Sequence, residues 1–238
     1  LCKPLLWTDG VAQELPLPDL NYRNEEIWYG VMARGISANG KIIYGTSWEN
    51  LDFGMLYWVN NGANTEKPKW VGEDVREVWE ETMKMSDGTE YTTHLVNGLI
   101  CQAQLTKISP NGKWLCAAYA VDTATEGMHD VITSKCPAFF NTETGTTYII
   151  DEYGPTTACG VTDDGEGFVG IGSSMCTSSI VVDVETGIKL GTAQEWVYDT
   201  FGIYVPDCRL ELCCAGKEVI TGATPLSDAK LGLVDGYF

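Results

Sequence analysis

The chain has 238 residues, 44% of them hydrophobic, which is enough for one large domain with its own core. Its 33 acidic residues against 15 basic ones give a net charge of −18. Because binding to a phosphate backbone needs clustered Lys and Arg, this balance argues against a nucleic-acid partner. The sequence has no run of about 18 apolar residues, so it predicts no transmembrane segment.

The first predicted element is "LLWTDG" at 5–10, which matches a strand-and-turn unit that recurs further along the chain. It predicts a half blade over residues 1–19. Because the chain starts at Leu1 rather than at Met, we expect a processed product from which a signal peptide has been removed. Nine cysteines without a C-x-x-C pair also fit an exported protein, in which some disulfides form.

The next stretch, "GISANGKI" at 35–42, differs from a phosphate-binding P-loop only in having Ile42 where the hydroxyl should be. Related stretches recur at 107–119, 160–172 and 211–223, with turn glycines at Gly40, Gly112, Gly165 and Gly216. A nucleotide loop has no reason to recur four times. We therefore interpret each copy as a β-hairpin turn, in which a polar-Gly pair supplies the positive φ that a tight turn needs.

A second strand-and-turn unit follows each copy, at 56–62, 138–145, 180–187 and 231–237. Together the two units predict four short strands per repeat and a period near 51 residues, which is the size of a propeller blade. The expected fold is all-β, a β-propeller of four-stranded blades. We expect four to five blades, with five preferred. The expected repeats are approximately 31–72, 104–152, 157–195 and 208–238.

An inserted loop or helix at 73–103 separates the first two repeats. Within it, "EDVREVWEETMK" places Val75, Val78 and Trp79 at helical spacing behind an acidic first turn, which predicts a short amphipathic helix. The following "KMSDGTEYTTH" predicts an Asp-Gly hairpin.

The tight glycine turns of every blade should lie on one face of the propeller, so the remaining connections should lie on the opposite face. Those connections are long, at 46–54, 73–103, 119–135 and 195–207. Long loops on a rigid scaffold are where binding usually occurs. The candidate ligand-binding residues are therefore Trp48, Glu49, Asp52, Trp79, Tyr91, His94, Asp122, Glu126, His129, Asp130 and Trp196.

Each kind of candidate has a structural alternative. Loop tryptophans could stack on a sugar or a peptide, whereas Trp58 and Trp70, within predicted strands, should pack between blades. His129 with its neighbouring carboxylates could form a metal or acid–base cluster, but a solvated polar loop is the favoured interpretation. "TDDGEG" at 162–167 lacks the full calcium-loop frame and is interpreted as a turn. We predict no catalytic residue, no metal and no cofactor.

The repeats "GISANGKIIYG" and "GVTDDGEGFVG" resemble the HAF-type Gly-Ile-Ser-x-Asp-Gly repeats of bacterial extracellular β-propellers. They also resemble blades in exported proteins of Bacteroides-like bacteria. The resemblance implies export to the periplasm or cell surface of a Gram-negative bacterium, with a lipid anchor as one option. It implies a recognition surface and supplies no catalytic residues.

The expected function is that of a non-catalytic recognition module that binds a glycan, a peptide or a partner protein through the long-loop face. An accessory role in an outer-membrane uptake complex would make an outer-membrane transporter the partner. The alternative is a carboxylate-dependent glycosidase or lyase with its site in the propeller funnel, because two suitably spaced carboxyls suffice for that chemistry. A purely structural segment of a larger surface protein is a third possibility.

Overall fold

The computed structural model describes residues 3–27, 30–47, 54–101, 107–122, 132–154, 156–171, 178–204, 210–212 and 219–221. Within these ranges the chain forms antiparallel β-sheets, accompanied by one α-helix, α1 (Ala193–Phe201), and one 3-10 turn, η1 (Gly62–Asn64). The prediction of an all-β fold is therefore confirmed.

Three sheets are meanders in which each strand pairs with the next one in the sequence. The first contains β3 (Val31–Ile36), β4 (Ile42–Ser47), β5 (Met55–Val59) and β6 (Lys69–Trp70). The second contains β10 (Lys107–Ile108), β11 (Trp114–Asp122), β12 (Ile132–Asn141) and β13 (Thr146–Ile149), and β9 (Leu99–Cys101) adds to it beside β11. The third contains β14 (Thr157–Val161), β15 (Glu166–Ile171), β16 (Ser178–Asp183) and β17 (Lys189–Thr192).

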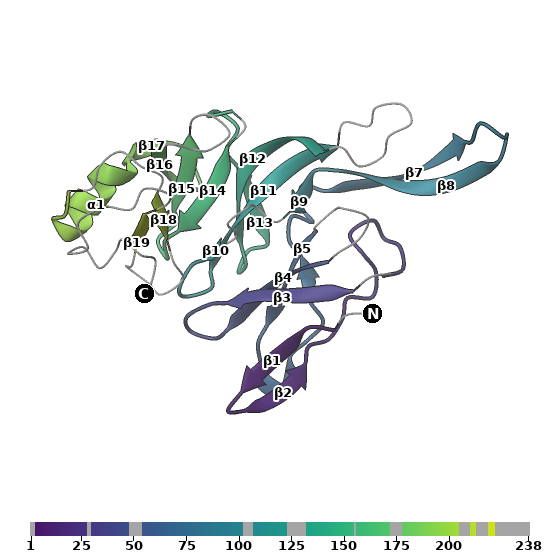
Figure 1. Ribbon diagram of the computed structural model, residues 1–238, viewed down its shortest axis with the longest axis horizontal. Helices are drawn as coiled ribbons and strands as arrows, with labels where there is room; N and C mark the ends of the chain where they lie inside the picture. The colour runs from purple at the N-terminus through teal and green to yellow at the C-terminus, as the bar shows by residue number, and fades with distance from the viewer. Residues whose placement is uncertain are drawn as a thin grey trace.

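Three further sheets have two strands each. They are β1 (Leu5–Thr8) with β2 (Val11–Glu14), β7 (Glu77–Lys84) with β8 (Glu90–Asn97), and β18 (Leu210–Leu212) with β19 (Val219–Thr221). Figure 1 shows the sheets in an arc from β1–β2 to β18–β19, while β7 and β8 project away from it. Among the described strands, β1 and β2 make no pairing with β18 or β19, so the described sheets form an open arc.

Local chemistry explains the hairpin turn between the first two strands of each meander. Gly40, Gly112 and Gly165 have φ values of 72°, 81° and 86°, a region that glycine enters without steric cost. A hydroxyl closes each turn: Ser37 Oγ, Ser109 Oγ and Thr162 Oγ1 accept from the backbone N–H groups of residues 42, 114 and 166, each at 3.0 Å. The interpretation of these glycines as structural turns, rather than as parts of a nucleotide loop, is confirmed.

The same turns also bond to one another across neighbouring sheets. Asn39 donates from Nδ2 to the carbonyl of Asn111 at 2.6 Å, and from its backbone N–H to the carbonyl of Pro110 at 3.2 Å. The backbone N–H of Asn111 donates in turn to Asp163 Oδ1 at 2.9 Å. These bonds fix the register of three successive sheets along one side of the molecule.

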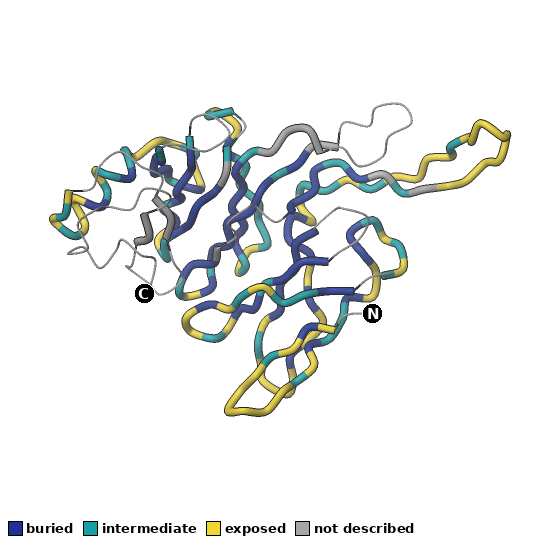
Figure 2. Tube along the Cα trace, in the orientation of Figure 1, coloured by how far each residue is buried: buried dark blue, intermediate teal, exposed yellow. Residues whose placement is uncertain are grey.

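The core lies between the sheets rather than inside any one of them, as the buried central strands in Figure 2 show. Tyr57 of the first sheet packs with Phe140 of the second, at a ring-centroid distance of 5.5 Å. Trp114 and Phe139 of the second sheet pack with Val169 of the third. Trp58 and Trp70 are buried, with exposed fractions of 0% and 8%, as predicted for tryptophans in strands.

The prediction of a helix in the segment 73–84 is wrong, because residues 77–84 form strand β7. Every residue of β7 faces a residue of β8, from Glu77 opposite Asn97 to Lys84 opposite Glu90. Val, Trp and Thr are good strand formers, and the Asp-Gly turn supplies a partner strand only a few residues away. The predicted hairpin at this turn is confirmed, with Gly88 at φ 88°.

Part of the segment 195–207 was expected to be a loop, but residues 193–201 form helix α1. Thr192 and Glu195 make a complete capping box at its start, and Gly202 ends it in the left-handed conformation at φ 69°. The helix covers the outer face of the third sheet, where Ala193 and Val197 join the cluster around Phe168. It is too short to cross a bilayer, and no other α-helix occurs in the described ranges.

Candidate functional site

The predicted site residues fall into three groups in the structure. Six lie outside the described residues: Trp48, Glu49, Asp52, Glu126, His129 and Asp130. Asp122 ends strand β11, and its side chain is not described. The remaining four occupy two places: Trp79, Tyr91 and His94 on the hairpin β7–β8, and Trp196 in α1.

The hairpin β7–β8, called the arm below, is the longest two-stranded ribbon of the described chain, and most of it is exposed (Figures 1 and 2). It extends for eight consecutive residue pairs without a bulge. Among the described strands, β7 and β8 pair only with each other, so each has an open outer edge. An isolated two-stranded ribbon is marginally stable at best in water.

The two faces of the arm differ in chemistry because successive side chains of a strand point to opposite sides. Trp79 and Tyr91 share one face, whereas His94 lies on the other, so the structure does not bring the three predicted residues together. Trp79 is 44% exposed and Tyr91 is 39% exposed. They are separated by about 13 Å along the ribbon, since Tyr91 lies opposite Met83, four residues beyond Trp79.

The Trp79 face combines aromatic surface with negative charge. Along β7 the side chains on this face are Glu77, Trp79, Glu81 and Met83. Glu77 and Glu81 are exposed and flank the indole. Tyr91 Oη donates to Met83 Sδ at 3.2 Å, which fixes the sulfur and the ring at the outer end of the stripe.

His94 on the opposite face anchors the base of the arm to the N-terminal segment. Its Nδ1 lies 3.1 Å from Glu25 Oε1, and its Nε2 lies 3.4 Å from Glu80 Oε1. Arg23 Nη1 donates to the carbonyl oxygen of His94 at 3.4 Å. Asn21 Oδ1 shapes this segment by accepting from the backbone N–H groups of Arg23 and Glu25 at 2.8 and 2.9 Å. His94 therefore positions the arm.

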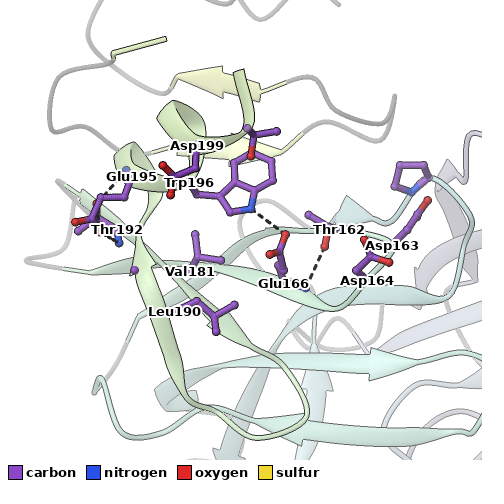
Figure 3. Close-up of a pocket in the computed structure, with 13 residues that line it drawn as sticks. Thr162, Asp163, Asp164, Glu166, Val181, Leu190, Thr192, Glu195, Trp196 and Asp199 are labelled. Atoms are coloured by element: carbon purple, nitrogen blue, oxygen red, sulfur yellow. Dashed lines mark hydrogen bonds between the residues drawn. The ribbon is translucent and has the colours of Figure 1, made fainter. Parts of the chain in front are cut away.

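Trp196 lies at a pocket of about 550 Å³ between α1, the third sheet and the turns of the second and third sheets (Figure 3). Its wall carries five carboxylates together with apolar groups. The lining residues are Pro110, Thr162, Asp163, Asp164, Glu166, Val181, Leu190, Gly191, Thr192, Glu195, Trp196, Asp199 and Thr200.

Several polar groups of this pocket make hydrogen bonds that stabilise the fold. Trp196 Nε1 donates to Glu166 Oε2 at 2.8 Å, as the dashed line in Figure 3 shows. The indole also packs edge-on against Phe168 and Phe201, at centroid distances of 5.0 and 5.9 Å. Trp196 is therefore a packing residue whose edge reaches the pocket.

Glu195 is committed to the capping box. Its Oε2 accepts from the backbone N–H of Thr192 at 2.7 Å, and the Thr192 hydroxyl lies 3.0 Å away. These bonds to the ionised carboxylate hold the pKa of Glu195 below its ordinary value. Asp163 also has a structural partner, because its Oδ1 accepts from the backbone N–H of Asn111 in the neighbouring turn.

Sequence reasoning missed both the pocket and the anchor of His94. The Thr-x-x-Glu pattern at 192–195 with Gly202 was a readable helix signal, so α1 and its acidic first turn could have been found. The contact between His94 and Glu25 had no sequence signal, because it joins residues 69 positions apart.

No group of three or more metal-ligating side chains occurs within the described part of the chain. The four described cysteines are thiols: Cys101, Cys116 and Cys159 are buried in the sheets, and Cys136 is partly buried. Burial, reinforced by the charge of Asp151, raises the pKa of the Cys136 thiol. The other five cysteines lie outside the described residues, so disulfides there remain a prediction.

Comparisons with known proteins leave the chain without an assigned family. No family model matches it, and no curated protein matches it. Among solved structures it is similar to hydrazine synthase of Kuenenia stuttgartiensis, with 12% identity, a TM-score of 0.31, and coverage of 88% of this chain and 71% of that chain. A likeness at this TM-score carries no argument about fold or activity.

Proposed function

We propose that this protein is a non-catalytic recognition module that binds a partner protein or peptide through the arm β7–β8, on a propeller-type scaffold. The scaffold part of the proposal is supported by three consecutive four-stranded meanders that pack face to face. The arm leaves this scaffold in the connection between the first and second sheets. It is therefore one of the long connections in which binding was expected.

The single observation that carries the proposal is the exposure of the arm. The regular eight-pair ribbon presents Trp79 and Tyr91, which are 44% and 39% exposed, and its turn presents Met85, which is 53% exposed. Exposed aromatic and Met side chains are enriched in protein interfaces. The ribbon has no counterpart in the described part of the connection between the second and third meanders, which is a short turn, or in the segment after the third meander, which forms helix α1.

A peptide or protein fits this surface better than a glycan does. The two exposed rings of Trp79 and Tyr91 stand at separate places on a narrow ribbon rather than forming one wall of a pocket. Open backbone edges, in contrast, suit another polypeptide. We retain export and a cell-surface or periplasmic setting, with an outer-membrane uptake complex as the assembly, as parts of this proposal that rest on the repeat resemblance.

The direct test places a photo-crosslinking amino acid at Thr82 on the arm and, as a matched control, at Glu143 in an exposed turn of the second sheet. Both variants are expressed in the native host and irradiated, and the adducts are identified by mass spectrometry. We expect a discrete protein adduct from position 82 and none from position 143. No adduct from position 82, or the same adducts from both positions, would refute recognition through the arm.

The pocket at α1 supports a second candidate function, a carboxylate-dependent glycosidase or lyase. Five carboxylates beside Trp196 supply the residue types of that chemistry. Glu166, Glu195 and Asp163 already have structural partners, which leaves Asp164 and Asp199 as the acids to test. The test incubates the protein with a panel of glycans and measures the release of reducing ends. Activity in the wild type that is lost in both Asp164→Asn and Asp199→Asn would establish the enzyme, and no activity of the wild type on any glycan would argue against it.

A further inference from the structure

We infer that the β7 edge of the arm binds an extended, basic segment of a partner protein as an added third strand. The inference rests on the proposed function and gives it a partner class and a binding mode. Three features of the arm carry it: the state of its edge, its charge, and the order of side chains on its Trp79 face.

The β7 edge lacks several of the devices by which proteins usually protect an exposed strand. Natural edges are blunted by Pro, bulges, inward-facing charges or charged side chains, Lys above all, and the charges within β7 are mainly glutamates, which repel an acidic strand but attract a basic one. The sequence of β7, EVWEETMK, has no Pro, and its only Lys stands at the last position, where it pairs with Glu90 at 3.0 Å. Its register with β8 is continuous. The row of outward N–H and C=O groups on β7 is therefore suited to strand addition.

The second strand of the arm is the less accessible edge. The base of β8 contacts β11 of the second sheet, and His94 on β8 is held by Glu25. No described strand pairs with the outer edge of β7. An incoming segment therefore meets this edge without displacing a described strand.

The negative charge of the arm favours a basic partner. Residues 77–97 contain five carboxylates and one Lys, a net charge of −4 with His94 neutral. Lys84 pairs with Glu90, and Glu80 lies beside His94, but Glu77 and Glu81 have no ion-pair partner among the described residues. A second copy of this chain would bring Glu beside Glu and carries the same net charge of −18, so self-pairing is disfavoured.

The order Glu77–Trp79–Glu81 sets the pattern of the partner. Side chains directly opposite each other on adjacent strands lie about 5 Å apart on the same face. A partner strand with Lys or Arg four positions apart places its cations beside Glu77 and Glu81. The residue midway between them, two positions from each, lies over the exposed indole of Trp79, where a Lys, an Arg or an apolar side chain packs well.

The test measures binding of a ten-residue peptide of alternating Lys and Val by isothermal titration calorimetry. One control peptide replaces Lys by Glu. A second keeps the Lys residues but is N-methylated at every residue, which removes the backbone donors of both edges while keeping the charge. Two protein variants are compared: Glu77→Lys with Glu81→Lys on the arm, and Glu143→Lys with Glu185→Lys in exposed turns of the second and third sheets, which change the net charge equally.

We expect the Lys–Val peptide to bind the wild-type protein and to lose about tenfold in affinity with the arm variant, since two charge pairs are reversed. The turn variant should retain nearly full affinity, and neither control peptide should bind. Equal losses in the two variants, or undiminished binding of the N-methylated peptide, would overturn strand addition at β7. Arm-dependent self-association in sedimentation velocity would likewise overturn it.

These outcomes separate the inference from the function on which it rests. If crosslinking at Thr82 finds a partner but the basic peptide binds independently of Glu77 and Glu81, recognition through the arm stands and the basic-strand mode fails. If position 82 yields no adduct, the proposed function itself fails, whatever the peptide does.

Discussion

Gly40 and Gly112 occupy the same position in two successive hairpin turns but have different surroundings. Both have positive φ, at 72° and 81°. A Cβ added at Gly40 would meet nothing within 4 Å, whereas one added at Gly112 would lie 2.8 Å from Ile42 Cγ1 and 3.2 Å from Ser37 Oγ. Gly112 is therefore required both for its backbone conformation and for the close approach of the first two sheets.

We predict that Gly112→Ala destabilises the protein more than Gly40→Ala does. The left-handed conformation should cost each variant about 1–2 kcal/mol. The contact with Ile42 should add about 1–3 kcal/mol to Gly112→Ala alone. Urea unfolding of both variants measures the difference, and equal losses would show that the sheets can separate enough to admit a methyl group.

Glu195 makes the stability of the start of α1 depend on pH. Bonds from the backbone N–H and the hydroxyl of Thr192 lower its pKa in the folded state. The stabilisation is therefore fully present above the unfolded-state pKa of about 4.3 and is lost as the pH falls through the lower folded-state value.

We predict a carboxyl-carbon NMR titration of Glu195 with its midpoint below about 4.3, and one near 4.3 for the same residue in urea-unfolded protein. Thr192→Ala should raise the folded-state pKa partway, because the backbone donor remains. A midpoint that is the same in folded and unfolded protein would mean that the capping box is absent in solution.

At the scale of elements, the arm is regular but contributes little to the core. Beyond its base, where Val78 and Val96 join the cluster of the first sheet, its side chains are mostly exposed. A shortened arm that ends at the residue pair Glu80–His94 therefore loses only the outer part of the ribbon and retains the contact of His94 with Glu25.

We predict that replacing residues 81–93 by an Asn-Gly turn leaves the thermal midpoint within about 2 °C of the wild type, because few buried contacts are lost. Asn-Gly suits a two-residue hairpin connection. Differential scanning calorimetry makes the measurement. A fall of about 10 °C would mean that the arm supports the scaffold, and would weaken its interpretation as a binding element.

At the scale of the whole molecule, each large sheet is stabilised by what lies against its faces. The N-terminal hairpin contributes Leu6 and the segment after it contributes Leu15 to the cluster around Trp58. Trp58 Nε1 donates to the carbonyl of Pro16 at 2.8 Å. Removing this segment would uncover the outer face of the first sheet and leave the indole N–H without its acceptor.

We predict that deleting residues 1–19 lowers the unfolding free energy by about 3–5 kcal/mol, from lost burial of Leu15 and the lost acceptor of Trp58. Guanidinium unfolding followed by Trp fluorescence and by circular dichroism should still give one shared transition. As a control, Gln13→Ala removes only an exposed hydrogen bond to the carbonyl of Gly62, and it should change the unfolding free energy by less than about 0.5 kcal/mol. Two separated transitions would contradict a single cooperative scaffold.

Structure could be predicted from short segments only where the sequence signal lay in neighbouring residues. The turns at Gly40, Gly112 and Gly165 were predictable because positive φ is a property of a polar-Gly pair and its immediate neighbours. Helix α1 carried an equally local signal in Thr192, Glu195 and Gly202, which was overlooked. For β7, helical spacing of a few apolar residues was misleading, because pairing with β8 outweighed a weak intrinsic preference.

The all-β class, the repeating hairpins and the strongly acidic charge were predictable from the sequence, since they follow from local backbone chemistry and from composition. Three features became visible only in the folded chain: Trp79 and His94 lie on opposite faces of the arm, His94 contacts Glu25, and Trp196 lines a pocket together with Glu166. Each of these depends on register or on contacts between residues far apart in the chain. A one-residue shift in register would have exchanged the faces of the arm.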